Sequence, residues 1–359
     1  MRAEEISHQR LLNLGIAQAT AETPDDVVGR LVAVQAQDFA GAKWALGLRL
    51  RNARDEDIEQ AFNEGSILRT HMLRPTWHFV TPADIRWLLR LSAPRVHAAN
   101  ATQYRKLGLD QEPFNRSNDV IAKALQDGNQ LTRDELRDAL RQDGIIAEGG
   151  QSMSYIMMRA ELDGIVCSGP RRGKQFTYML LDERAPLVKP MEREEALAQL
   201  VLHYFVSRGP ATVQDFVKWS GMTTADTAIG LEAAQSHLRQ ETIDGKTYWM
   251  PIGAIDAKGD VSPKAYLLSV YDEYISSYKD RSAINNPATS AKLISLGNAL
   301  NYVVVVNGQI VGTWRRTLRK DSVIIETNTF TALTKAEEEA VVEATKRYGD
   351  FWGLRTVLE

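Results

Sequence analysis

The sequence predicts an α+β fold of tandem winged-helix (helix-turn-helix) repeats followed by a small C-terminal β-barrel-like domain. Three stretches of helical pattern each end in a β-hairpin pattern, which indicates an internal repeat. From about residue 256 onward the pattern changes to three β-rich runs and one closing helix. We therefore expect four domains, over residues 1–110, 111–188, 189–255 and 256–359.

The composition is that of a folded protein. The 359 residues are 44% hydrophobic and 25% charged, and a chain of this length is expected to form several compact domains. The single cysteine, Cys167, excludes an intrachain disulfide and a cysteine-based zinc site, and it fits a reducing cytoplasm. No signal-peptide pattern and no apolar run of ~18 residues is present. We expect a cytoplasmic monomer that has no membrane contact, no metal and no cofactor.

The first repeat is predicted from helical spacing that gives way to alternation. Residues 5–20 place apolar side chains at helical spacing, and Pro24 with the two acids after it marks the start of a second helix. Two further helices are expected over residues 42–50 and 56–62. The segment 66–80 then alternates, is bent by Pro75 and predicts a β-hairpin. In a winged helix this hairpin is the wing.

The second and third repeats follow the same order. Thr132 and Glu135 form a capping-box pattern at the start of one helix, and residues 149–164 form the next. Residues 165–181 give two strands around a Gly-Pro-Arg-Arg-Gly turn. Asp244-Gly245 is a strong signal for the two-residue turn of the third hairpin. The helices of the third repeat are expected over 196–210, 211–221 and 222–235.

The C-terminal segment reads as a small β-rich unit. Its predicted strands are 303–306, 310–314 and 323–327. Asn307-Gly308 joins the first two strands, and residues 334–353 form an amphipathic helix that closes the unit. Linkers are expected near 182–190 and 251–263.

Basic residues are clustered although the net charge is −3. That charge argues against a general nucleic-acid binder, but a phosphate backbone responds to local patches. Between residues 66 and 109 the sequence has seven lysines or arginines and one acid. Solvated surface is the alternative interpretation of each cluster. The residues predicted to bind DNA are Arg69, His71, Arg74, Arg171, Arg172, Lys174, Arg315 and Arg316.

Gln35 and Gln37 form the most informative motif of the chain. They lie two residues apart between two predicted helices, so in an extended backbone both amides point to one side. Two such amides can hold a water or a sugar through their donors and acceptors. Structural capping of the next helix is the alternative, and we expect Asp38 to be the N-cap of that helix.

Three segments together resemble the AlkZ-type family of bacterial winged-helix DNA glycosylases. They read VQAQDFAGAKWALGLRL, RTHMLRPTWHFVTPADIRWLLRL and LLSVYDEYISSYKDR, and they occur in the family's order across most of the chain. Gln35 and Gln37 match the two positions of the family's Gln-x-Gln signature. The resemblance implies excision of alkylated bases from damaged double-stranded DNA, including N7 adducts or interstrand crosslinks. It also implies tandem winged helices with a small C-terminal β-barrel.

The side-chain chemistry of glutamine limits the mechanism that this resemblance implies. A glutamine has no pKa near neutrality and can only orient a water and stabilise charge by its dipole. Alkylation at purine N7 or N3 makes the base cationic and weakens its glycosidic bond, so positioning a water can suffice. We expect Gln35 and Gln37 to be catalytic residues of a monofunctional glycosylase. Lys43 has no supporting motif for a lyase step, and the tryptophans near the motif are expected in the core.

Two other functions are open at this stage. One is a non-catalytic winged-helix DNA-binding or regulatory protein, and the other is a protein–protein module that the net charge allows. The expected recognition helix 151–163 has a methionine-rich centre, and the helix 223–236 has no lysine or arginine. Neither resembles a strong reader of the major groove. If DNA is bound, we expect a shaped cradle that does not read sequence.

Overall fold

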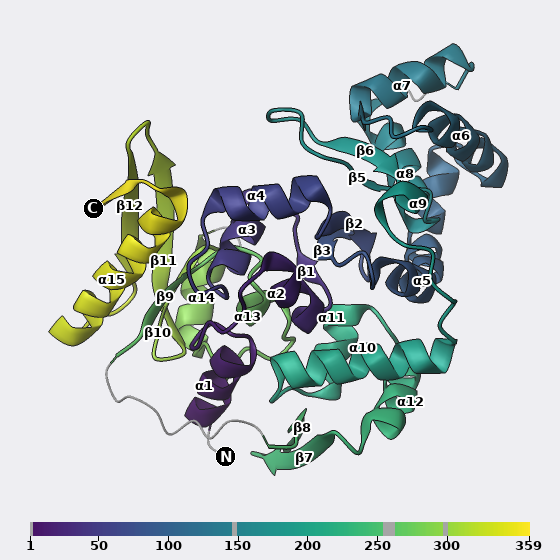
Figure 1. Ribbon diagram of the computed structural model, residues 1–359. Helices are drawn as coiled ribbons and strands as arrows, with labels where there is room; N and C mark the ends of the chain where they lie inside the picture. The colour runs from purple at the N-terminus through teal and green to yellow at the C-terminus, as the bar shows by residue number, and fades with distance from the viewer. Residues whose placement is uncertain (1–2, 146–148, 254–262, 297–300) are drawn as a thin grey trace.

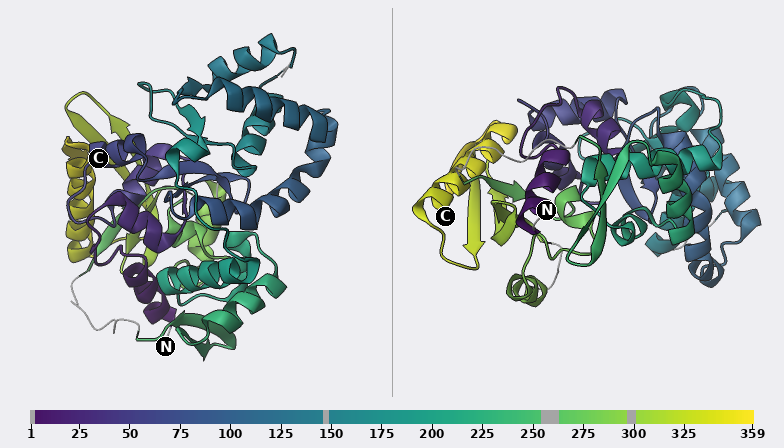
Figure 2. Two further views of the ribbon diagram at one scale, coloured as in Figure 1. Left: turned by 45° about the vertical axis from the view of Figure 1, so that its right-hand side comes forward. Right: turned by 90° about the horizontal axis from the view of Figure 1, so that it is seen from below.

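The computed structural model describes residues 3–145, 149–253, 263–296 and 301–359 and has a mixed α+β fold. Figure 1 shows the C-terminal sheet and α15 at one end of the molecule and α6 to α8 at the other, with the N-terminal helices between them. The two views of Figure 2 agree with this arrangement. Within the described ranges, no helix has both the length and the apolar character needed to cross a membrane.

The N-terminal part forms short helices around a three-stranded sheet in which β3 lies between β1 and β2. The predicted first helix ends early, at Asn13, because Gly15 has a φ of +74° and turns the chain there. The hairpin predicted over 66–80 is confirmed. The elements are α1 (Ala3–Asn13), α2 (Pro24–Leu31), β1 (Val34–Gln35), α3 (Phe39–Gly47), α4 (Asp55–Glu64), β2 (Leu68–Met72) and β3 (Thr76–Val80).

The second part begins with a helix of 22 residues, α5, that the sequence analysis leaves unassigned. The capping box of Thr132 and Glu135 is confirmed at the start of α7, and β4, just before it, forms a three-stranded sheet with β6 and β5. Figure 1 shows the β5–β6 hairpin projecting away from α7. The elements are α5 (Ile85–Lys106), α6 (Gln111–Ala124), β4 (Leu131–Thr132), α7 (Arg133–Gln142), α8 (Gly149–Leu162), β5 (Val166–Ser168), β6 (Thr177–Leu180) and α9 (Leu181–Arg184).

The third part has helices followed by a two-stranded hairpin, in the order that the sequence predicts. Asp244 and Gly245 occupy the turn, both at positive φ, as a tight hairpin turn requires. The elements are α10 (Arg193–Arg208), α11 (Val213–Ser220), α12 (Thr224–Ala234), β7 (Leu238–Ile243) and β8 (Lys246–Pro251). The linker predicted at 251–263 falls mostly outside the described residues.

The C-terminal part contains a five-stranded sheet whose order is β13-β12-β11-β10-β9. The two outer strands are not paired with each other, so the predicted barrel is an open sheet, and α15 packs against it (Figure 1). The elements are β9 (Ala265–Leu268), α13 (Glu273–Ser276), α14 (Pro287–Ser295), β10 (Val303–Val306), β11 (Gln309–Leu318), β12 (Ser322–Thr329), α15 (Lys335–Trp352) and β13 (Arg355–Leu358).

One hydrophobic core joins the two ends of the chain. It includes Trp44 of α3 and Tyr348 and Phe351 of α15, whose rings lie 4.8 and 5.2 Å from the Trp44 ring. The indole Nε1 of Trp44 donates a hydrogen bond of 2.7 Å to the carbonyl of Leu267 in β9. The N-terminal helices that flank the glutamine motif are therefore fixed against the C-terminal sheet.

Candidate active site

The glutamine motif begins in the shortest strand of the N-terminal sheet. Gln35 ends β1 and lies directly opposite His78 of β3. Its side chain is mostly buried, with 8% of the residue exposed, whereas Gln37 is exposed just before α3. Gln37 makes no side-chain hydrogen bond with the part of the chain that the structure describes. The motif thus combines one fixed amide with one free amide at the surface.

A fully buried carboxylate holds the backbone of the motif. Oε1 of Glu273, in α13, accepts a hydrogen bond of 3.0 Å from the backbone N–H of Gln35. Its Oε2 accepts from Arg208 at 2.8 and 3.1 Å, and also from Trp219 and Ser277. The Arg208 charge and these hydrogen bonds outweigh the cost of burial and hold the pKa of Glu273 at about 2. Glu273 is therefore ionised at neutral pH and positions Gln35.

Glu273 belongs to the motif YDEYISSYKDR (residues 271–281), and other residues of this motif anchor it to the surrounding elements. Asp272 accepts two hydrogen bonds from the buried guanidinium of Arg49, at 2.8 and 2.9 Å, and caps α13. The hydroxyl of Tyr274 donates to the carbonyl of Gly308, and that of Tyr278 donates to the carbonyl of Arg208, each at 2.8 Å. The motif therefore links β1, α3, α10 and the C-terminal sheet around Gln35.

The side chain of Gln35 is oriented from the tip of the β2–β3 hairpin. Nη2 of Arg74 donates a hydrogen bond of 3.3 Å to Oε1 of Gln35. Burial and the nearby Arg74 charge lower the pKa of His78 to about 3, so its ring is neutral. Nδ1 of His78 lies 2.9 Å from the carbonyl of Thr76 and therefore carries the proton. Arg74 was predicted to bind DNA, and the structure places it beside the motif.

Asp38 has a different role from the predicted cap. It occupies the N-cap position of α3, but its side chain makes no capping hydrogen bond. Its carboxylate instead accepts a hydrogen bond from the hydroxyl of Tyr302, which lies just before β10. Burial and the Asp38 carboxylate both raise the pKa of Tyr302, so the phenol stays protonated. The residue after Gln37 is therefore tied to the C-terminal part.

Arg69 and His71 face the protein interior in this structure. The guanidinium of Arg69 lies between the rings of Trp77 and Phe176, 4.3 and 4.7 Å from their centres, and donates to the carbonyl of Ala36. Burial lowers the pKa of Arg69 to about 10. Nδ1 of His71 contacts the buried carboxylate of Glu161 in α8. Both residues support the strand beside the motif, and their contact with DNA remains a prediction.

The cations of the β5–β6 hairpin differ in how freely they can reach a ligand. Arg171 is mostly buried over Phe176 and lies 3.6 Å from a carboxylate oxygen of Glu59. Arg172 is exposed and pairs with Glu135 at 2.7 Å. Lys174 is exposed at the turn, and no ion pair involves it within the described residues.

The two arginines of β11 point in different directions. Arg315 is exposed and pairs with Glu326 of β12. Arg316 is half-buried, and its guanidinium lies 5.7 Å from the ring centres of Tyr302, Tyr348 and Trp352. Arg316 therefore belongs to the aromatic cluster that also positions Tyr302, whereas Arg315 is the cation that faces solvent.

The methionine-rich centre of α8 belongs to the core. Met153 and Met157 are 0% and 2% exposed and pack with residues of α6 and α7. Of the polar residues that this helix offers, Arg159 is tied to Asp163 by a hydrogen bond of 2.7 Å. The unusual composition of this expected recognition helix thus reflects packing within its own unit.

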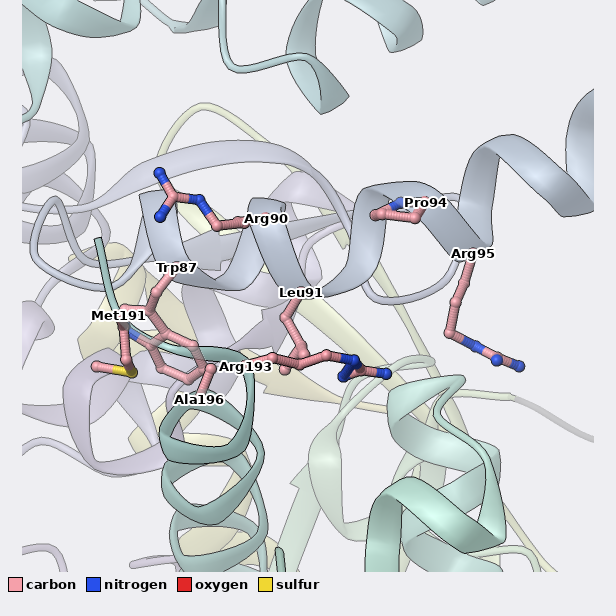
Figure 3. Close-up of a pocket in the computed structure, with 8 residues that line it drawn as sticks. All are labelled: Trp87, Arg90, Leu91, Pro94, Arg95, Met191, Arg193 and Ala196. Carbon is pink, nitrogen blue, oxygen red and sulfur yellow. The ribbon is translucent and has the colours of Figure 1, made fainter. Parts of the chain in front are cut away.

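A pocket of about 230 Å³ lies between α5 and α10 (Figure 3). Trp87 and Leu91 of α5 point toward Met191 and Ala196, while Arg90 points to the other side of α5. Arg193 at its rim pairs with Asp226 at 2.7 Å. The residues that line this pocket are mostly apolar and do not include the glutamines, so it is separate from the motif.

Comparison with known proteins decides the family. The family described as "DNA glycosylase AlkZ-like" matches residues 28–351 of the sequence. The chain belongs to this family. Its members are enzymes that cleave N-glycosyl bonds in DNA, so the predicted enzyme class and the resemblance of the three motifs are confirmed.

The chain is also similar to two proteins from Streptomyces sahachiroi. An "Interstrand DNA cross-link repair glycosylase" from that organism is 25% identical over 318 residues, which cover 82% of each chain. The solved structure of the S. sahachiroi DNA glycosylase AlkZ superposes with a TM-score of 0.79 at 21% identity, over the full length of both chains. The second comparison establishes the shared α+β fold.

Sequence reasoning missed several residues that build the site. Glu273 lies inside a motif that was matched to the family, but the pattern gave its carboxylate no role. Arg208 and Tyr302 carry no local signal, because their partners lie 65 and 264 residues away in the sequence. The one hint the sequence offers is that Arg208 follows the mostly apolar stretch 196–206 of α10.

Proposed function

We propose that this AlkZ-like DNA glycosylase excises cationic N7- or N3-alkylated bases from double-stranded DNA with a water positioned by Gln35 and Gln37. The observation that carries the proposal is the pairing of a fixed amide with an exposed one. Glu273 and Arg74 hold the backbone and the side-chain oxygen of Gln35, while Gln37 is free to meet a substrate. Preorganised dipoles of this kind act where charge develops in the transition state.

The chemistry requires no general base. In an N7-alkylated guanine nucleotide the base is cationic, and the bond between C1′ and N9 breaks with its electron pair leaving on the base. The base departs neutral, and the sugar becomes an oxocarbenium ion. The water held by the two glutamines adds through its oxygen to C1′ and releases a proton to solvent. Orientation of this water supplies the catalytic advantage.

The same proposal covers the contact with DNA. We assign residues 1–110, 111–188 and 189–255 as three winged-helix units that form a cradle for a damaged duplex, and 256–359 as the β-rich unit that closes it. Lys174, Arg172 and Arg315 are exposed cations suited to phosphate contacts. Arg171 and Arg316 lie next to these exposed cations in the sequence. The glutamine motif and its neighbouring strand are supported by Arg69, His71 and Arg74. Because a relative is named for interstrand crosslink repair, crosslinked duplexes are included among the substrates.

A base-release assay tests the proposal. A duplex with one N7-methylguanine is incubated with the enzyme, and alkali then cleaves the strand at abasic sites. We expect cleavage by the wild type and a loss of about 10²–10³-fold in the single-turnover rate for Gln35→Ala and for Gln37→Ala. Gln126→Ala, which removes an exposed glutamine remote in sequence, is the matched control and should keep the wild-type rate.

Three results would contradict the proposal. The first is wild-type protein that leaves the duplex intact while binding undamaged DNA tightly, which favours a non-catalytic DNA-binding protein. The second is Gln37→Ala protein that cleaves at the wild-type rate. The third is a rate loss that comes with loss of fold, which circular dichroism of each variant detects and which would make the motif structural.

A further inference from the structure

Gln35 belongs to a row of three cross-strand neighbours in the N-terminal sheet. His78 of β3 lies directly opposite Gln35 of β1 on one side and directly opposite Thr70 of β2 on the other. Residues that face each other across antiparallel strands project their side chains from the same face of the sheet. His78 and Thr70 are fully buried, whereas Gln35 reaches the surface with 8% of the residue exposed. The row therefore runs from the candidate site into the interior.

The backbone pairing brings Gln35 and His78 close together. The N–H of Ala36 donates to the carbonyl of Trp77 at 2.8 Å, and the N–H of Gln35 donates to Glu273 instead of to β3. Gln35 and His78 therefore form a non-hydrogen-bonded pair. In such a pair the two Cα atoms are about 4.5 Å apart and the side chains are closer than in the hydrogen-bonded kind. The His78 side chain is thus the cross-strand neighbour of the Gln35 amide.

The His78 ring presents an acceptor to this row. Its Nδ1 donates to the carbonyl of Thr76 at 2.9 Å, so the neutral ring carries its lone pair on Nε2. Burial, together with the charge of Arg74, lowers the pKa of His78 to about 3, so the ring has this form at neutral pH. Nε2 is buried and accepts no hydrogen bond from the part of the chain that the structure describes. A buried acceptor without a donor costs about 1–3 kcal/mol.

Three further polar atoms around Gln35 share this condition. They are Oγ1 of Thr70 in the same row, Oγ1 of Thr76 two residues before His78, and Nε of Arg74, whose Nη2 donates to Gln35. Each is buried and has no hydrogen bond with the described residues. Buried polar groups are seldom left without partners, and a buried water commonly bonds about three of them. Donors and acceptors are mixed in this group, which suits a water better than an ion.

The support of Gln35 is incomplete at its amide nitrogen. Glu273 accepts from the backbone N–H, and Arg74 donates to the side-chain oxygen at 3.3 Å. The side-chain nitrogen donates no hydrogen bond to the residues that the structure describes. The last torsion of a glutamine is broad, so one long hydrogen bond does not fix the plane of the amide. A second contact is needed to hold this plane.

We propose that a buried water joins the Gln35 amide to His78 and makes His78 a positioning residue for that glutamine. The water donates one hydrogen to Nε2 of His78 and the other to Oγ1 of Thr70, and its oxygen accepts from the side-chain nitrogen of Gln35. Three partners are the usual number for a buried water. The amide keeps its second N–H and one lone pair of its oxygen for the attacking water. The inference rests on the proposed function for the catalytic role of Gln35.

A crystal structure of the wild-type protein, at a resolution that shows ordered waters, tests the site directly. We expect one water at about 2.7–3.2 Å from Nε2 of His78, Oγ1 of Thr70 and the side-chain nitrogen of Gln35. This water is distinct from the attacking one, because His78 and Thr70 are fully buried. A structure with no water at hydrogen-bond distance from Nε2 would overturn the inference.

Two variants of His78 test its effect on the reaction. His78→Gln keeps an acceptor near the place of Nε2, whereas His78→Asn keeps only a group near the place of Nδ1. On the N7-methylguanine duplex we expect His78→Asn to lower the single-turnover rate by up to about 10²-fold, the loss that a small misplacement of a reacting group causes. Its Kd for the duplex should not change, and His78→Gln should recover most of the rate. His237→Asn, at an exposed histidine remote in sequence, is the matched control.

Thr70→Val keeps the test valid if His78→Asn does not fold. It removes the hydroxyl that bonds the water and retains the shape of the side chain, so we expect a smaller rate loss at unchanged Kd. Thr70→Ser should keep the wild-type rate. If both single variants fold, the double variant should lose no more than His78→Asn alone, since both act through one water. Wild-type rates in the folded variants, or additive losses, would contradict the inference.

The outcomes separate this inference from the catalytic proposal. A water bonded to His78 and Gln35 in a wild-type protein that excises no base would support the water site and refute the proposed function. Base excision by a wild-type protein whose His78 Nε2 contacts no water would do the reverse.

Discussion

The buried ion pair behind the motif allows one prediction to be worked out in detail. In Glu273→Gln the carboxylate that accepts hydrogen bonds from Arg208 and from the backbone of Gln35 becomes a neutral amide of the same shape. Arg208 is then a fully buried cation without a counter-charge. Removal of one partner of a buried pair typically costs about 3–5 kcal/mol.

The ionisation of Glu273 gives a second route to the same magnitude. The pKa of Glu273 is about 2 in the folded protein against an ordinary value of 4.5. Because the folded-state pKa is the lower one, this stabilisation is complete above pH ~4.5 and is lost as the pH falls toward 2. A shift of this size corresponds to about 3 kcal/mol. The two routes agree in order of magnitude.

Urea unfolding followed by circular dichroism measures the effect. At pH 7 we expect the first unfolding transition of Glu273→Gln to lose about 3–5 kcal/mol relative to wild type. The pH dependence of that transition between pH 4.5 and 3 should also be weaker in the variant. Glu232→Gln, at an exposed position of α12, is the control. A Glu273→Gln protein within 1 kcal/mol of wild type, with an unchanged acid dependence, would refute the reasoning.

Three further predictions follow from the contacts of single residues. Tyr302→Phe removes the donor to Asp38 and should lower the unfolding free energy by about 1–3 kcal/mol in urea titrations, and an unchanged value would show that the hydrogen bond contributes nothing. Lys174→Gln should weaken binding equally for unrelated duplex sequences and reduce the salt slope by about one, whereas a sequence-dependent effect would argue for base contacts. Met157→Ala should cost about 2–5 kcal/mol in thermal or urea unfolding with no change in sequence preference, and an altered preference would instead return α8 to the role of a reading helix.

Elements set by local chemistry could be predicted from the sequence. The Asp244-Gly245 turn and the capping box of Thr132 and Glu135 depend on residues within a few positions of each other, and both form as expected. The helix α5 could not be predicted as readily, because Pro94 lies inside it and interrupts the signal. Turns and helix starts that depend on neighbouring residues were therefore easier to predict than a long helix interrupted by a proline.

The candidate site residues came from the sequence and their catalytic role stays a prediction, whereas the residues that support them could not be predicted. Gln35 and Gln37 were found from a short motif within a familiar sequence context. Their supports depend on long-range packing, since Glu273 reaches Gln35 across 238 residues of sequence. Asp38 shows the same limit. Its position before α3 predicts a capping side chain, but its carboxylate instead accepts a hydrogen bond from Tyr302, which is distant in sequence. Tertiary contacts overrode local preference at this position.

The core shared by α3 and α15 constrains the order of events during synthesis. Trp44 is translated more than 200 residues before Leu267 and more than 300 residues before Tyr348 and Phe351, which surround its ring. The part of α3 that packs on these groups therefore waits exposed until α15 has been translated. A message truncated before α15 would yield a protein that has both glutamines and cannot complete the core behind them.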